Sequence, residues 1–241
     1  MAATLECKGL TKRFGRKLAL GTAGPDGKAV GIDLTVEAGR IVGLLGPNGS
    51  GKTTLIKLAT GLITPTAGEI RIGGYAPGVQ SKRLISYLPE RTYLSDWMRV
   101  RDLIAFFRDF YEDFNEHKAL DMLERLRINP QDKIKPLSKG TKEKVQLIVV
   151  MSREAKLYLL DEPIGGVDPA AREFILSTIL SNYNEDATIL ISTHLIADVE
   201  RVLDEVIFIS EGGILRTAQV DALREAEGKS VDALFREVFK C

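Results

Sequence analysis

Nine consecutive residues combine glycine, lysine and threonine in a spacing that can bind phosphate. They fit the pattern G-x-x-x-x-G-K-[ST] and follow an apolar run, 41–45. Glycines let successive backbone N–H groups turn toward one anion, and a following helix adds its positive dipole end. Lys52 can reach the β- and γ-phosphates of a nucleoside triphosphate, and the Thr53 hydroxyl can bind Mg²⁺. The alternative is a glycine-rich turn that binds nothing. The stretch comprises Gly46, Pro47, Asn48, Gly49, Ser50, Gly51, Lys52, Thr53 and Thr54.

Two acidic residues, Asp161 and Glu162, follow another apolar run, 157–160. Open α/β sheets bind ligands at the carboxyl ends of their strands, so a carboxylate there can hold Mg²⁺. We assign this role to Asp161. Two like charges ~4 Å apart repel by about 4 kcal/mol at an effective dielectric of 20, so a second carboxylate next door indicates a use. We expect Glu162 to orient or deprotonate an attacking water. The alternative is a pair of ordinary surface acids.

A histidine, His194, follows a third apolar run that ends in Ser192 and Thr193. Its ring can hydrogen-bond the terminal phosphate or the catalytic carboxylate. The alternative is a histidine that is satisfied at a helix start. The other histidine, His117, lies in a charged helical stretch and is expected on the surface.

These groups need a sheet that holds them at one edge. Apolar and alternating runs predict strands, and 21–28 reads as a loop because of its turn residues. A helix over about 168–182 joins two of the strands into a β–α–β unit. Residues 205–216 read as an antiparallel hairpin, and a terminal helix carries Val231, Leu234, Phe235 and Val238. The predicted strands are 4–10, 30–37, 41–45, 69–72, 84–88, 157–160 and 188–192.

The middle of the chain is helical in pattern. Apolar residues recur every three or four positions over 100–114 and again over 120–126. A third helix begins at Ser138, which is a good N-cap residue. The sequence therefore predicts an α/β core with a mostly helical insert at about 90–152.

Composition excludes several classes of protein. The 241 residues include 33 Lys and Arg against 33 Asp and Glu, a balance that gives no general attraction to nucleic acid. No run of 18 apolar residues is present, so no membrane span is predicted. The amino terminus lacks the apolar segment of a secretory signal. Cys7 and Cys241 have no metal-like spacing and are expected to be free thiols.

Six elements in one order resemble the nucleotide-binding subunit of ABC transporters. Besides the phosphate-binding loop and the helical insert, they are 137–141 (LSKGT), 159–163 (LLDEP), 166–169 (GVDP) and 192–194 (STH). The resemblance implies a P-loop NTPase core with a mostly parallel sheet, an N-terminal antiparallel β subdomain and an inserted α-helical subdomain. It implies one ABC ATPase domain over 1–241, with about 1–89 and 153–241 as core and about 90–152 as helical subdomain.

The resemblance also implies a mechanism and partners. Lys52 and Thr53 are then the phosphate and Mg²⁺ ligands, Asp161 the magnesium acid, Glu162 the general base and His194 the switch histidine. In this family two ATPase subunits, identical or paralogous, sandwich two ATP molecules between the phosphate loop of one and the signature sequence of the other. Separate transmembrane permease subunits place the pair at the cytoplasmic face of the membrane. Two further residues are Asp168, which crosses the dimer, and Phe14, which stacks on adenine or is otherwise a core or edge aromatic.

Three departures from the family pattern stand out. The signature is usually Leu-Ser-Gly-Gly-Gln; here Ser138 and Gly140 remain, but Lys139 replaces a glycine. If that position were left-handed, lysine would cost ~1–2 kcal/mol, and its charge near the triphosphate could offset part of this. Glu90 stands where the family commonly has a glutamine that reaches Mg²⁺ or water, and we carry that role over to it. Residues 164–165 replace small hydroxyl residues.

The segment 91–98 is aromatic and apolar yet reads as a loop. In the family this region abuts the groove that receives a short helix of the membrane subunit. Aromatic residues and methionine are enriched at interfaces, although packing between insert and core is the alternative. The candidate anchors are Tyr93, Leu94, Trp97 and Met98.

The sequence therefore favours an ATPase that powers a membrane transporter. Residues 88–90 and the short C-terminal tail resemble the export branch of the family, including drug and antibiotic exporters. The alternatives are an importer ATPase and a non-transport ABC ATPase that acts on ribosomes or DNA. A plain P-loop kinase is disfavoured by the Ser138 signature and by His194.

Overall fold

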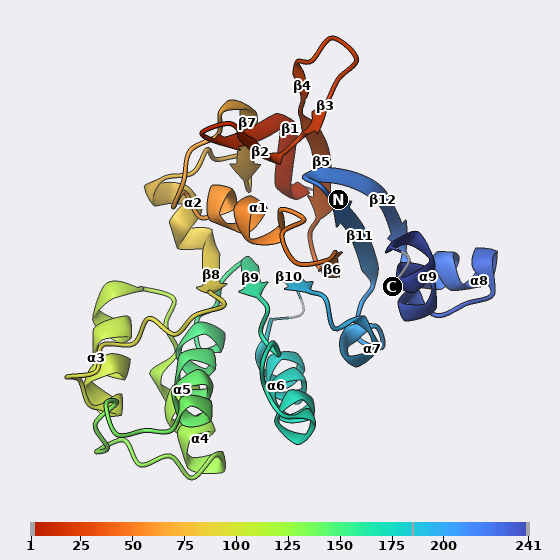
Figure 1. Ribbon diagram of the computed structural model, residues 1–241. Coiled ribbons are helices and arrows are strands. Elements are labelled where there is room, and N and C mark those ends of the chain that lie inside the picture. The colour runs from red at the N-terminus through yellow and green to blue at the C-terminus, as the bar shows by residue number, and fades with distance from the viewer. Residues whose placement is uncertain (1–2, 185, 240–241) are drawn as a thin grey trace.

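The computed structural model describes residues 3–184 and 186–239 and has a mixed α/β fold (Figure 1). Its main sheet has six strands in the order β12-β11-β6-β10-β9-β8, parallel except for the antiparallel pair β11–β12. The strands are β6 (Ile41–Leu45), β8 (Ile85–Leu88), β9 (Leu157–Asp161), β10 (Thr188–Thr193), β11 (Glu205–Ser210) and β12 (Gly213–Gln219).

A second, antiparallel sheet forms from the N-terminal part of the chain. Its strand β1 (Ala3–Phe14) pairs with β2 (Lys17–Leu20), β5 (Ile32–Glu37) and β7 (Ala67–Ile72). The predicted loop at 21–28 carries a small ladder between β3 (Thr22–Ala23) and β4 (Ala29–Val30), which is a difference from the expectation. The register between these two short strands brings their ends together around the turn 24–28.

Helix α1 (Lys52–Ala59) lies between the two sheets, as Figure 1 shows. Its side chains Leu55, Ile56 and Leu58 are buried with Leu5 of β1 and Leu44 of β6 in one apolar cluster. Burial of such side chains contributes about 1.5–3 kcal/mol each. This packing fixes the helix that begins at Lys52 against the sheet edge where the chemistry was predicted.

The other face of the main sheet is covered by helices. Along β9, Leu157 and Leu159 face α1, whereas Tyr158 and Leu160 face these helices, so both faces of the strand are buried. The helices on this face are α6 (Pro169–Asn182), α7 (Ile196–Val199), α8 (Val220–Glu227) and α9 (Val231–Phe239).

Three helices between β8 and β9 form a group of their own, at the lower left of Figure 1. They are α3 (Val100–Phe110), α4 (Glu116–Arg125) and α5 (Lys139–Met151). The predicted helix over 100–114 stops at Phe110, because Tyr111 has an extended backbone, although Phe114 is still buried. Three short helices were not predicted: α2 (Val79–Leu84), α7 and α8.

Arg153 ties this helical group to the main sheet. Its side chain is 3% exposed and donates to the carbonyl oxygens of Ile85, at 2.6 Å, and Arg83, at 3.0 Å. It also pairs with both carboxylate oxygens of Asp113 at 2.9 Å and lies over the ring of Tyr111. The contact therefore joins the C-terminal end of α5 to β8.

Several remaining expectations concern exposure. Cys7 is a buried free thiol, while Cys241 lies outside the described residues. His117 is exposed, as expected. Val238 is half-exposed and so is not part of the core that the other apolar residues of α9 join. Among the described residues, none of the helices has the length and apolar composition needed to cross a bilayer.

Candidate functional site

The phosphate-binding loop connects β6 to α1. A side chain at Gly46 would meet the carbonyl oxygen of Ile209 at 2.2 Å, and Gly51 has φ +113°, a conformation that favours glycine. Lys52 is 5% exposed, and its Nζ donates to the carbonyl oxygens of Gly46, at 2.7 Å, and Pro47, at 3.2 Å. The loop thus curls around the ammonium group of the lysine that begins α1.

This loop borders a cavity of about 400 Å³. Phe14 lines one side of it with Lys17 and Ala19. The residue is 50% exposed, and Lys12 Nζ lies 5.1 Å from the centroid of its ring. Phe14 is therefore not a core residue. Lys17 and Ala19 were not predicted as part of the site, because they lie on β2 with no motif to mark them. The remaining lining residues are Asn48, Gly49, Gly51, Lys52, Thr53, Thr54, Glu90 and Glu162.

Asp161 is the last residue of β9 and is 1% exposed. Its Oδ1 accepts hydrogen bonds from the hydroxyls of Ser192, at 2.6 Å, and Thr53, at 3.1 Å. Burial raises the pKa of Asp161, the two hydrogen bonds oppose this, and the charges of Glu90 and Glu162 add to it. The buried Oδ2 has no hydrogen-bond partner within the described part of the chain.

This donor set fits Mg²⁺. The ion is commonly held by one or two carboxylates, with substrate phosphates and water completing its ligands. The unpartnered Oδ2 of Asp161 and the Thr53 hydroxyl next to it supply such oxygen atoms. No group of three or more His, Cys, Asp or Glu side chains that could hold a metal is found in residues 3–184 and 186–239. A cation here would therefore depend on phosphate oxygens as well.

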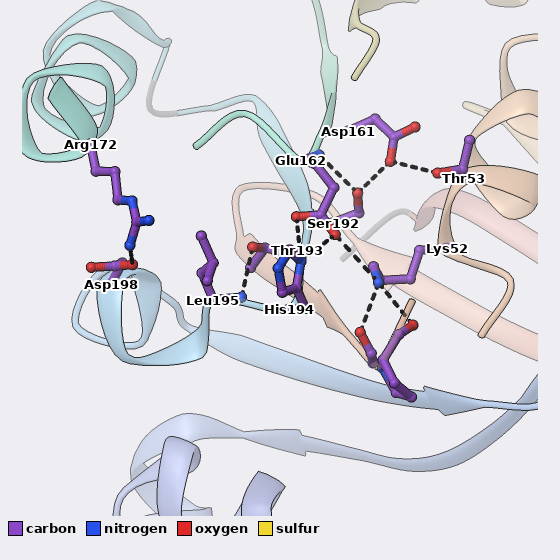
Figure 2. Close-up of polar contacts among 12 residues, drawn as sticks. Lys52, Thr53, Asp161, Glu162, Arg172, Ser192, Thr193, His194, Leu195 and Asp198 are labelled. Carbon is purple, nitrogen blue, oxygen red and sulfur yellow. Dashed lines mark hydrogen bonds and ion pairs between the residues drawn. The ribbon is translucent and has the colours of Figure 1, made fainter. Parts of the chain in front are cut away.

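Glu162 lies at the centre of the polar cluster in Figure 2. Its Oε1 is 3.4 Å from Lys52 Nζ, and both of its carboxylate oxygens are 3.1 Å from Nδ1 of His194. Its φ of 49° is unusual for a residue other than glycine, and such strain clusters at functional sites. The backbone N–H of Glu162 donates to the carbonyl oxygen of Ser192 at 3.0 Å. The contact between the second acid and the histidine was one of the two options predicted for His194.

Ser192 is a site residue that the sequence did not single out. It lies directly opposite Asp161 in the parallel pairing of β10 with β9. Its hydroxyl donates to Asp161 and accepts from the N–H of Glu162 at 3.2 Å. A polar residue ending an otherwise apolar strand was the available signal, but only the register shows which acid it faces.

The family model of ABC transporters matches residues 30–165, more than half of the chain. The chain belongs to the ABC transporter family. The "ABC transporter ATP-binding protein YtrB" of Bacillus subtilis is 32% identical over 199 residues, 80% of this chain and 68% of YtrB. The "Nod factor export ATP-binding protein I" of Burkholderia lata is 33% identical over 233 residues, 93% of this chain and 74% of that protein. The "Structure of ATP binding subunit of ABC transporter" has a TM-score of 0.85 at 29% identity and covers 98% of this chain and 99% of its own.

The chain is therefore an ABC ATPase, and the cavity beside the phosphate-binding loop is its candidate nucleotide site. Glu90 is exposed and lines this cavity just beyond the end of β8. Ser138 caps α5, since its Oγ accepts from the N–H of Thr141 at 3.1 Å. Lys139 begins that helix and has no positive φ, so the cost considered for a left-handed lysine does not arise. Its Nζ is 3.8 Å from Glu143.

The signature residues and Asp168 lie apart from this cavity. Ser138, Lys139, Gly140 and Asp168 are all exposed, and none of them is among the described residues that line it. The structure thus does not bring the signature to the phosphate loop of the same chain. A site that used both would need two chains.

The aromatic segment after Glu90 is divided between surface and core. Trp97 is 79% exposed and Tyr93 48% exposed, whereas Leu94 is partly buried. Met98 is 9% exposed and packs in the core with Val100, so the expectation that it anchors a partner is wrong. Its carbonyl oxygen accepts from the N–H of Ile134, which holds it against the helical group.

Proposed function

We propose that this chain is the ATP-hydrolysing subunit of a membrane exporter and acts together with a second ATPase subunit. The observation that carries the proposal is one polar cluster at the cavity. Lys52, Thr53 and Glu162 line the cavity, while Asp161 bonds Thr53 and His194 contacts Glu162 from behind them. Membership of a family of ATPases supports a role of this cluster in ATP hydrolysis. The exporter and the pairing of subunits go beyond the family and need their own tests.

In this proposal each residue has a stated task. Lys52 and the N–H groups of its loop bind the β- and γ-phosphates, and Phe14 stacks on adenine. Thr53, Asp161 and Glu90 hold Mg²⁺, which when bound neutralises charge on the phosphates. Glu162 accepts a proton from the water that attacks the γ-phosphorus, while the bond to the ADP oxygen breaks.

His194 acts through Glu162. The 3.1 Å contacts of its Nδ1 hold the carboxylate in one orientation above Lys52. Holding a reacting group in place is worth several kcal/mol of a barrier, because orientation is fixed before reaction. His194 is therefore proposed as the residue that keeps Glu162 directed at the water.

The exposed signature supports a shared site. Ser138, Lys139 and Gly140 lie at the start of α5 outside the cavity, so in the proposal they contact the nucleotide bound by the partner chain. Asp168 then lies at the boundary between the two chains. We propose one ABC ATPase domain over 1–241, with a core of about 1–89 and 153–241 and a helical subdomain of about 90–152.

The export direction rests on the relatives. One is named for Nod factor export and another, from Bacillus subtilis, for linearmycin resistance. Separate permease subunits would hold the ATPase at the cytoplasmic face of the membrane, with Tyr93, Leu94 and Trp97 as contacts. The relatives also include proteins whose names give no direction, such as YtrB.

Dilution tests the shared site. Purified protein is diluted through its association range with ATP and Mg²⁺ in excess, and the hydrolysis rate per chain is followed together with the mass in solution. We expect the rate per chain to fall as the pair dissociates. A rate per chain that stays constant through complete dissociation would contradict the proposal.

Co-expression tests the membrane role. The protein should sediment with membranes when its polytopic partner is present and not when that partner is absent. Recovery of the protein on ribosomes or DNA instead would favour the non-transport alternative. Transport of a labelled substrate into inverted vesicles, driven by external ATP, then tests the direction.

A further inference from the structure

Arg172 makes two directed contacts that no motif of the site explains. It lies in the first turn of α6 and is 25% exposed. Its Nε donates to the carbonyl oxygen of Val167 at 3.0 Å, and its Nη1 donates to Asp198 Oδ2 at 2.9 Å. The planar guanidinium presents its N–H groups in fixed directions, so it can hold two acceptors in a set geometry, whereas the donors of a lysine ammonium rotate.

The two acceptors belong to the segments that carry Glu162 and His194. Val167 lies in the loop between Glu162 and α6, and Asp198 lies in α7, four residues after His194. Figure 2 shows Arg172 and Asp198 on one side of the cluster in which Glu162 and His194 meet. Arg172 therefore joins the two segments that the Glu162–His194 contact also joins, but at a different place.

The bond of Arg172 to Asp198 matters because α7, which carries Asp198, is short. It has four residues and begins at Ile196, so it cannot hold its position by its own hydrogen bonds. On its far side, Glu200 accepts a hydrogen bond from the N–H of Asp232 at 3.0 Å. Ile196 and Val199 of α7 are buried in the core, and on the side toward α6 the bond from Arg172 to Asp198 adds a directed contact.

A second ion pair offers a comparison. Arg201 pairs with Glu173, and so also joins α6 to the segment after α7, but both side chains are more than half exposed. Exposed pairs of this kind contribute about 0–1 kcal/mol. Within the described part of the chain, Arg201 makes no hydrogen bond to the loop that follows Glu162, so it is a matched control for Arg172.

We propose that Arg172 is a positioning residue for ATP hydrolysis: by joining the Val167 carbonyl to Asp198, it sets the contact between Glu162 and His194. It does not touch the nucleotide cavity. Its loss leaves nucleotide binding in place and misaligns the carboxylate that receives the proton. The inference rests on the proposed role of Glu162 and His194 in hydrolysis.

Kinetics give the first test. Arg172→Ala, Arg172→Lys, Asp198→Asn and Arg201→Ala are compared with the unchanged protein for kcat and KM of ATP hydrolysis. We expect Arg172→Ala to lower kcat about 10-fold with KM within about two-fold, since small misplacements of reacting groups are costly. Arg172→Lys keeps the charge but not the fork and should fall between. Arg201→Ala should match the unchanged protein.

The histidine ring gives the second test. The chain has two histidines, so in a His117→Gln background the imidazole NMR signals belong to His194 alone. Arg172→Ala should shift these signals, and Arg201→Ala should not. If Arg172→Ala does not fold, Asp198→Asn and Arg172→Lys serve in both tests.

The outcomes separate the inference from the proposed function. Unshifted His194 signals, or a kcat within two-fold of the unchanged protein, overturn the role of Arg172. If the unchanged pair hydrolyses no ATP, the proposed function fails, and the NMR comparison still decides whether Arg172 sets the position of His194.

Discussion

Lys52 Nζ lies 3.4 Å from Glu162 Oε1, and the two side chains are 6% and 10% exposed. The lysine of the phosphate-binding loop is therefore the cation that faces the second of the two adjacent acids. The adjacency of Glu162 and Asp161 in the sequence implies an electrostatic repulsion between their two carboxylates. The buried lysine offsets that repulsion, and the histidine ring on the other side of Glu162 occupies both carboxylate oxygens.

Replacing this carboxylate tests its role directly. Glu162→Gln should keep ATP binding and lower the rate of hydrolysis about 100-fold or more, because the amide accepts no proton from water. Stopped-flow hydrolysis and equilibrium binding of ATP measure the two quantities. The same variant should accumulate as an ATP-bound dimer on size exclusion. Glu173→Gln, an exposed acid on α6, is the control. Full turnover by Glu162→Gln would remove the residue from the role of base.

Ser192 offers a prediction for stability as well as activity. Ser192→Ala removes the hydroxyl that bonds Asp161 at 2.6 Å and accepts from the N–H of Glu162. The free energy of unfolding should fall by about 1–3 kcal/mol, because a buried carboxylate loses a donor. Urea titration measures this, and Ser177→Ala, on the exposed side of α6, should change it by less than about 0.5 kcal/mol. Equal losses of stability in the two variants would show that the hydrogen bonds of Ser192 do not stabilise the fold more than those of an exposed serine.

Lys139 predicts a dependence on salt. Its exposed charge at the start of α5 would face phosphate in a closed pair, so it should strengthen that pair at low ionic strength. Lys139→Met keeps a good helix former and removes the charge, while Lys139→Gly restores the residue usual in the family. Both should lower ATPase activity at low salt and flatten its decline as salt is added. Unchanged rates and an unchanged salt profile in both variants would end this hypothesis.

Glu205, at the start of β11, predicts a pH dependence away from the nucleotide site. Burial raises its pKa above the ordinary value of 4.5; Arg40 opposes this, and Glu37 adds to it. A carboxyl whose pKa is higher in the folded than in the unfolded protein favours folding when it is protonated. Its contribution to the free energy of unfolding is fully present below the unfolded pKa and is lost as the pH rises through the folded pKa. Glu205→Gln should therefore be more stable than the unchanged protein at pH 7.

The comparison of Glu205→Gln with the unchanged protein is made by thermal unfolding across pH. The gap in stability between the two proteins should narrow as the pH falls below the ordinary glutamate value of 4.5, because the carboxyl then becomes protonated in both states. A gap that is constant over this range would assign the effect of the substitution to packing instead of charge.

The elements with a local signal were predictable from the sequence. The loop at 46–54, the cap at Ser138 and the apolar strands are each determined by a few neighbouring residues, and the structure has them at those places. Phe14 and Glu90 line the cavity. They were predicted from their places in the order of the family motifs, because their local sequence carries no such signal. Helix α2 was missed since it has six residues, with Ser81 buried at its start and no apolar stripe to mark it.

The contacts between distant segments were not predictable. Ser192 faces Asp161 only through the register of β10 with β9, and Arg172 reaches Asp198 across 26 positions of the chain. From sequence alone, a lysine or arginine in a helix is interpreted as a solvated surface residue, because the neighbouring residues do not indicate which acceptor it binds. Met98 shows the reverse error: a methionine in an aromatic loop resembles an interface residue, yet the helical group covers it.

The anchorage at Arg153 has a mechanical consequence. Helix α5 runs over 13 residues from Lys139 to Met151, about 20 Å at 1.5 Å per residue, and the buried arginine holds the sheet end of this rod. A turn of about 10° at that pivot moves the opposite tip by roughly 3–4 Å, by the same helix length. Ser138 is at that tip, so a small rotation at the β8 end of the helix is magnified at Ser138.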